Sequence, residues 1–220
     1  TLMFVIGPGT VETHPGPHET RRGRLADLVS PAILVGILSS FAIIFALGAR
    51  TSFYPIFLKD LGFSASVIGA MDSVRGLTAV VSRLSIAAAL RLLGGRFPVL
   101  SVSLLLLALG IGMTPACTTI PLIVVNAIVI GVGFGVAMPL SQAVVFDSVP
   151  PDRRGVAMGA RMTGNRMAQM GGPLLFGFVI QALRMSASFV IGGLLLFALT
   201  LPMLLWWARS RKLTGSAPAL

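Results

Sequence analysis

The sequence predicts an all-α membrane protein in which six transmembrane helices form one bundle. Three observations support this fold class. Apolar residues make up 55% of the 220 residues. Charged residues make up only 11%, where a soluble domain has roughly 25%, and the mean hydropathy is +0.92. This composition excludes a disordered chain, a secreted disulfide scaffold and an ordinary soluble enzyme.

Residues 1–30 hold a short apolar run and then a polar linker. The run is too short for the hydrophobic region of a signal peptide, and the chain opens without an initiator methionine. We therefore expect the end of a preceding helix in a longer chain, followed by a cytoplasmic linker. The two histidines, His14 and His18, lie in this linker, where Pro15 and Pro17 disfavour a shared helix face. We expect no metal site and no cofactor.

Six apolar stretches follow the linker, and each is long enough to cross a bilayer. About 20 mostly apolar residues span roughly 30 Å of hydrocarbon. Uncharged runs cover 28–49, 97–146 and 185–208, and a Thr-Pro-Ala-Cys-Thr-Thr break divides the middle run in two. The stretches 66–90 and 155–183 are apolar but contain charge. The expected spans are 31–57, 65–90, 97–115, 120–146, 155–183 and 186–208, before a cytoplasmic tail at 209–220.

Positive charge predicts the orientation, because cytoplasmic loops of membrane proteins are rich in Lys and Arg. With the first loop in the cytoplasm, the cytoplasmic set is Arg21, Arg22, Arg24, Arg91, Arg96, Arg153, Arg154, Arg209, Arg211 and Lys212, against Arg50, Lys59 and Arg184 on the other side. We therefore expect a multi-pass protein of the plasma (inner) membrane with both ends in the cytoplasm. The net charge of +10 lies mostly between apolar runs, so no nucleic-acid partner is expected.

The six spans are expected to form a three-plus-three inverted repeat. The second and fifth spans carry the charge, and each is followed by a cleaner span. Gly69-Ala70 precedes Arg75 by about the same distance by which Gly159-Ala160 precedes Arg166. Inverted repeats of this kind are common in transporter folds.

Three segments carry a resemblance to a known family. They are Ala49-Arg50-Thr51-Ser52-Phe53-Tyr54-Pro55 with Leu61-Gly62-Phe63-Ser64, then Gly131-Val132-Gly133-Phe134-Gly135 with Pro139-Leu140-Ser141-Gln142, and finally Pro150-Pro151-Asp152-Arg153-Arg154-Gly155-Val156-Ala157-Met158-Gly159 with Gly171-Gly172-Pro173 and Gly177. Together they resemble the C-terminal half of a major facilitator superfamily transporter, helices seven to twelve of twelve. The resemblance covers residues 31–208.

The resemblance implies a fold and a broad activity. Two six-helix bundles rock around a central site, so the chain is expected to act as a secondary transporter, or permease, of a small molecule. Its partners are then the lipid bilayer, the substrate and the missing N-terminal six-helix half. The alternative is a non-transporting membrane subunit, or an isolated half that needs a partner chain. An intramembrane enzyme is not expected, because both histidines lie in the linker and Asp72 is the only acidic residue expected near the midplane.

The charged residues inside the spans are the candidate site. Charge inside hydrocarbon costs at least about 2.5 kcal/mol per residue, so it needs a partner or a function. Arg75 lies about 15 Å into the second span and Arg166 about 16 Å into the fifth, which places both near the bilayer midplane. Asp72 can share a helix face with Arg75. On the fifth span, polar side chains at a spacing of four form a stripe that consists of Arg161, Asn165 and Gln169.

The candidate substrate or coupling-ion residues are therefore Asp72, Arg75, Asn165, Arg166 and Gln169. We expect Arg75 and Arg166 to bind an anionic group of the substrate and Asp72 to carry a coupling proton. The alternative is an Asp72–Arg75 or Asp72–Arg166 pair that only holds the helices together. Two arginines nearer the cytoplasmic face, Arg83 and Arg161, are expected to stabilise the bundle, and Arg50 is expected to anchor its helix at the outer interface.

Overall fold

The computed structural model describes residues 31–214, and every element there is helical. The expected linker and preceding helix end at 1–30, like the tail beyond residue 214, lie outside the described residues. Seven α-helices follow in order: α1 (Pro31–Asp60), α2 (Ala65–Leu84), α3 (Ile86–Leu93), α4 (Arg96–Gly112), α5 (Ile120–Asp147), α6 (Arg154–Ala182) and α7 (Met185–Thr214). Two short 3₁₀ turns, η2 (Thr114–Ala116) and η3 (Pro151–Arg153), precede α5 and α6. The all-α class is confirmed.

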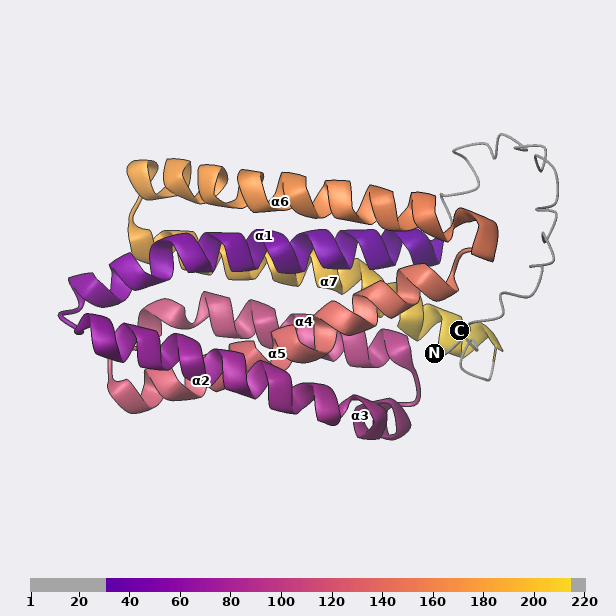
Figure 1. The fold of residues 1–220 in the computed structure, drawn as a ribbon, viewed down its shortest axis with the longest axis horizontal. Helices are drawn as coiled ribbons and strands as arrows, with labels where there is room; N and C mark the ends of the chain where they lie inside the picture. The colour runs from indigo at the N-terminus through magenta and orange to yellow at the C-terminus, as the bar shows by residue number, and fades with distance from the viewer. Residues whose placement is uncertain (1–30, 215–220) are drawn as a thin grey trace, which may run out of the picture.

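The helices run side by side along one long axis (Figure 1). The α1–α2, α4–α5 and α6–α7 connections lie at one end of the bundle, and α3 and the α5–α6 connection lie at the other. Within the described range, Ile33–Asp60 and Ile120–Asp147 are each long and apolar enough to cross a membrane. The helices α2 and α3, bent by 60° at their junction, meet the same criterion together. The full set of six spans stays a prediction.

The helices pair in a regular pattern. α1 packs along α6, α2 packs along α5, and α4 packs along α7. With α2 and α3 counted as one span, the first triplet is α1, α2–α3 and α4, and the second triplet is α5, α6 and α7. If each span is exchanged with the corresponding span of the other triplet, the α1–α6 pair becomes the α5–α2 pair. The α4–α7 pair then maps onto itself. A two-fold relation between the two triplets would produce this pattern, and the three-plus-three repeat stays a prediction.

Glycines on α5 allow this helix to pack closely between α2 and α4. A Cβ atom at Gly131 would lie 2.7 Å from the carbonyl oxygen of Arg75, and one at Gly133 would lie 2.8 Å from that of Ser103. A Cβ atom at Gly135 would likewise lie within 2.8 Å of the α2 backbone. Real Cβ atoms essentially never make contacts shorter than 3.0 Å, so only glycine permits these helix contacts.

A glycine turn aligns the end of α1 with the start of α2. Gly62 has φ +87°, in the left-handed region. The N–H of Gly62 bonds to the carbonyl of Lys59, and the N–H of Phe63 bonds to the carbonyl of Leu58, at 2.9 and 3.1 Å. These two bonds form a Schellman motif, which ends α1 and reverses the chain. The last turns of α1 therefore lie beside the first turns of α2.

Candidate substrate site

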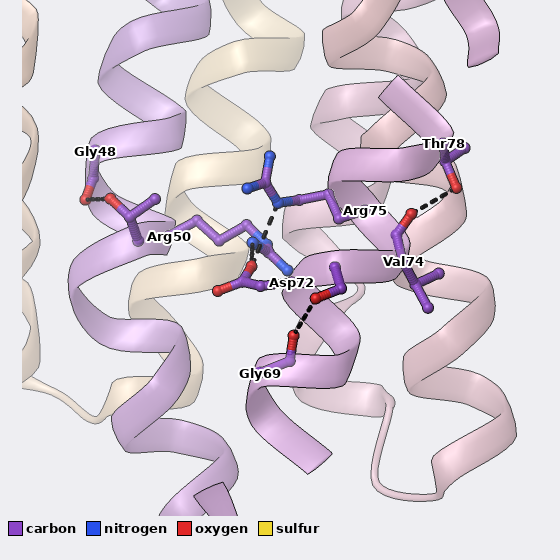
Figure 2. A network of polar contacts seen from close by, with 9 residues as sticks. Gly48, Arg50, Gly69, Asp72, Val74, Arg75 and Thr78 are labelled. Atoms are coloured by element: carbon purple, nitrogen blue, oxygen red, sulfur yellow. Dashed lines mark hydrogen bonds and ion pairs between the residues drawn. The ribbon is translucent and has the colours of Figure 1, made fainter. Parts of the chain in front are cut away.

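An ion-pair cluster joins α1 and α2 (Figure 2). The Arg50 Nη1 atom lies 3.0 Å from Asp72 Oδ1, and the Arg75 Nε atom lies 3.3 Å from the same oxygen. The Arg50 side chain is 1% exposed, whereas the Asp72 side chain is 42% exposed. One carboxylate thus accepts from two guanidinium groups on different helices and stays open on one side.

Arg50 also packs on an aromatic ring of its own helix. Its guanidinium carbon lies 4.0 Å from the centre of the Tyr54 ring, and such a contact contributes about 2 kcal/mol or more when it is desolvated. The Nε and Nη2 atoms of Arg50 and the hydroxyl of Tyr54 are buried without hydrogen-bond partners among residues 31–214. Over the same range, Asp72 is the only carboxylate that pairs with Arg50.

The expectation that Arg50 anchors α1 at the outer interface is wrong, because Arg50 is fully buried inside the bundle. The distances of Arg50 and Asp72 from the α1–α2 turn could have predicted this pairing from the sequence. Arg50 lies about 15 Å from the α1 end at Asp60, and Asp72 lies about 10 Å from the α2 start at Ala65, at about 1.5 Å per residue. Two helices joined by a tight turn bring residues at such similar depths together.

A second group of polar side chains lines a pocket of about 370 Å³ between α1, α5 and α6. Its lining residues are Ile44 from α1, Met138 and Gln142 from α5, and Arg161, Met162, Asn165, Arg166 and Gln169 from α6. All three members of the α6 stripe reach this pocket. Its volume falls in the range of roughly 300–1,000 Å³ that is typical of small-molecule sites.

Hydrogen bonds order the polar side chains of the pocket. The Ser40 hydroxyl on α1 donates to Asn165 Oδ1 at 2.6 Å. The Arg166 Nη1 atom donates to Gln169 Oε1 at 3.0 Å, within one turn of α6. The Ser40–Asn165 bond leaves the two amide N–H donors of Asn165 for other partners.

Arg161 is the buried charge of this pocket. Its side chain is 3% exposed. The Nη2 atom donates to the Ser141 hydroxyl at 3.3 Å and lies 3.8 Å from the sulfur of Met138, both on α5. Arg161 therefore links α6 to α5, as a bundle-stabilising residue would, and it also faces a cavity.

The five predicted site residues fall into two groups. Asp72 and Arg75 belong to the cluster between α1 and α2, and Asn165, Arg166 and Gln169 belong to the pocket beside α6. No hydrogen bond or ion pair between described residues joins the two groups. Of the two pairings considered from the sequence, the Asp72–Arg75 contact is present, while Arg166 bonds to Gln169 instead.

Other charged residues pair at the opposite end of the bundle from the α1–α2 turn. Arg96 at the start of α4 forms an ion pair with Asp147 at the end of α5. The guanidinium of Arg154 lies 4.2 Å from the centre of the Phe146 ring. These contacts fasten helix ends. Over the described ranges no three His, Cys, Asp or Glu side chains are grouped as a metal site would require.

The single cysteine lies in the connection between α4 and α5. Cys117 is 9% exposed, its thiol donates to the carbonyl oxygen of Met113 at 3.4 Å, and burial raises the pKa of the Cys117 thiol. A raised pKa leaves less of the reactive thiolate at neutral pH. Alkylation by N-ethylmaleimide is therefore expected to be slow at pH 7 and to rise at higher pH than for an exposed thiol. Thr118→Cys combined with Cys117→Ser provides that exposed thiol, and identical pH profiles would contradict the prediction.

The family described as the Major Facilitator Superfamily matches residues 34–219 of the chain. The match takes in almost all of the bundle, including both groups of polar residues. Among curated proteins, none matches the chain.

Proposed function

The chain belongs to the major facilitator superfamily, and from this we propose that it carries a small molecule across a membrane by alternating access. The members of this family are transporters. A transport site is supported by one observation: polar and charged side chains are exposed on the surface of an apolar helical bundle. Asp72 is 42% exposed, and Arg166 and Gln169 are exposed as well.

The exposed polar groups also support a missing partner half. Facing lipid, an ionised side chain near the bilayer centre costs about 2.5 kcal/mol or more. Such side chains therefore face protein or a water-filled cavity. We accordingly take the chain as the C-terminal six-helix half, a three-plus-three repeat. A second half with six helices covers the surfaces on which Asp72 and Arg166 are exposed, and the substrate passes between the halves.

The proposed roles follow from charge. Arg75 and Arg166 attract an anionic group of the substrate, while Asn165 and Gln169 donate hydrogen bonds to it. Asp72 carries the coupling proton. Protonation of Asp72 removes the negative charge to which the guanidinium groups of Arg50 and Arg75 are both attracted. Proton uptake therefore weakens the Arg50–Asp72 contact between α1 and α2. Proton uptake and helix movement are coupled in this way.

The proposed setting is the plasma (inner) membrane with both chain ends in the cytoplasm. Three basic residues were assigned to the outer side from the sequence. Since Arg50 is buried within the bundle, only Lys59 and Arg184 remain there. The excess of positive charge at the other end is therefore larger than the sequence suggested, which supports this orientation.

Replacing Arg166 by glutamine is expected to reduce transport by about 10- to 100-fold, because a charge-assisted hydrogen bond contributes roughly 1.5–3 kcal/mol. The full-length protein is reconstituted into proteoliposomes and screened for uptake of labelled monocarboxylates, amino acids and sugars, with and without a pH gradient. Arg83→Gln is the matched control, because Arg83 is exposed on α2 and, contrary to the bundle-stabilising role expected from the sequence, its side chain makes no hydrogen bond or ion pair with a described residue.

Two outcomes bear directly on these roles. Unchanged transport by the Arg166→Gln variant, at equal protein in the membrane, contradicts a role of Arg166 in binding. Transport that ignores the pH gradient contradicts proton coupling through Asp72. A full-length protein that moves none of the screened compounds in either direction argues for the non-transporting subunit.

A further inference from the structure

We propose that the pocket between α1, α5 and α6 binds a small organic carboxylate, and that the buried guanidinium of Arg161 holds the carboxylate group. The inference rests on the proposed transport function and names its substrate class. It places Arg161 beside Arg166 at the anion, whereas Arg75 lies in the other polar group. Three features of the pocket support carboxylate binding: an uncompensated buried charge, the chemistry of the pocket wall and the free hydrogen-bond donors beside it.

Arg161 is a buried cation without a counter-ion. Its side chain is 3% exposed, and its Nε atom is buried without any hydrogen-bond partner among the described residues. The partners it has, the Ser141 hydroxyl and the Met138 sulfur, are both neutral. Burying a charge is unfavourable unless an opposite charge compensates it. An anion in the adjoining pocket provides that compensation.

Arg50 offers a direct comparison within the same bundle. Both arginines are almost fully buried. Arg50 has a protein carboxylate at 3.0 Å, on Asp72. Arg161 has no such partner in the described part of the chain, and a pocket with no acidic residue in its wall adjoins it instead. An arginine that only stabilises helices would be paired as Arg50 is, so the unpaired one points to a ligand.

The pocket wall fits a carboxylate with an apolar body. None of the lining residues is acidic, and Arg166 adds a second guanidinium. The side-chain donors of Gln142 and Asn165 lie in the same wall, and the apolar remainder consists of Ile44, Met138 and Met162. A guanidinium binds a planar carboxylate through two parallel hydrogen bonds. The Ile and Met side chains then cover the rest of the molecule.

Existing hydrogen bonds leave suitable donors free. Ser40 occupies the side-chain oxygen of Asn165 and leaves its N–H groups available. Arg166 is held by Gln169 through one nitrogen only, Nη1. Both side chains are thus oriented by neighbours, yet each can still donate to an anion. This is the arrangement expected of a pre-formed site.

Binding can be tested without transport, by the melting temperature of the full-length protein in detergent. The probes are benzoate and hexanoate, each compared with its neutral amide, benzamide and hexanamide, and with inorganic sulfate. A ligand that binds only the folded protein raises its melting temperature. We expect the two carboxylates to raise it by several degrees and the amides and sulfate to have no effect.

Two pocket variants and one control locate the effect. Arg161→Gln is expected to remove the carboxylate shift. Gln142→Glu places a carboxylate in the pocket wall, so it is expected to raise the melting temperature without ligand and to remove the shift. Arg83→Gln, outside the pocket, is expected to keep the shift.

The proposal is overturned if neither carboxylate stabilises the protein, if the amides or sulfate stabilise it equally, or if the shift survives in Gln142→Glu. The Gln142→Glu variant tests whether the carboxylate binds in this pocket even if Arg161→Gln fails to fold. Carboxylate binding without transport would contradict the proposed function and leave this binding site intact. Transport of an uncharged compound, with no carboxylate shift, would contradict the site and leave the transport function intact.

Discussion

Replacing Asp72 with asparagine is expected to destabilise the bundle by about 3 kcal/mol, because it leaves Arg50 as a buried cation without a counter-ion. Loss of one partner of a fully buried ion pair costs about 3–5 kcal/mol, and the half-exposed Asp72 places this pair at the lower end. Arg75 can turn to solvent, since its side chain is 17% exposed, but Arg50 at 1% cannot. Unfolding of the full-length protein by titration with sodium dodecyl sulfate measures the effect.

A second substitution separates the charge effect from lost packing. Replacing a buried ion pair by apolar residues is often close to neutral. The double variant Arg50→Leu, Asp72→Asn is therefore expected to regain most of the stability that Asp72→Asn loses. Lys59→Gln, which changes an exposed residue near the same turn, serves as the control. Simple addition of the two single losses in the double variant would show that Arg50 and Asp72 do not act as a pair.

Gly135→Ala is expected to destabilise the protein by about 1–3 kcal/mol or more, the usual cost of overpacking. The added Cβ would lie 2.8 Å from the Cα of Ala79. That neighbour is helix backbone rather than a flexible side chain, so α2 itself must move. Because α2 carries Asp72 and Arg75, the same displacement is expected to lower transport.

Gly76→Ala is the matched control for this helix contact. Gly76 lies on α2, and a Cβ atom there would meet nothing within 4 Å. Alanine is favoured over glycine in a helix by about 1 kcal/mol, so this variant is expected to be as stable as the natural protein or more so. Melting temperatures in detergent and monodispersity by size-exclusion chromatography compare the two. Equal losses in both variants would contradict close packing at Gly135 as the cause.

The helical class follows from the sequence because long uncharged runs leave few other structures for a backbone in lipid. The bend between α2 and α3 was not predicted. It falls at Ser85, where no glycine or proline marks a break. The length of an apolar run predicts the length of the helix, but the direction of the helix axis depends on the neighbouring helices.

The candidate site was predicted in part. Spacing on one helix correctly placed Asn165 and Gln169 on a common face with Arg161, because helical periodicity alone decides this. The partners from other helices were not predicted. The α1–α2 turn places Arg50 beside Asp72, and the packing of α5 in the bundle places Gln142 in the pocket wall. Such contacts depend on how helices pair, which a single sequence does not state.

The charges of the two polar groups have a consequence for the response to membrane voltage. Four guanidinium groups, those of Arg50, Arg75, Arg161 and Arg166, accompany one carboxylate, Asp72. Moving one elementary charge through 100 mV changes the energy by about 2.3 kcal/mol. In the proposed alternating-access cycle, an unloaded protein that moves this excess of positive charge through the field would be electrogenic, and an anionic substrate would reduce the charge that moves. In that proposed cycle, the return of the unloaded protein would be the step that responds most strongly to the electric field.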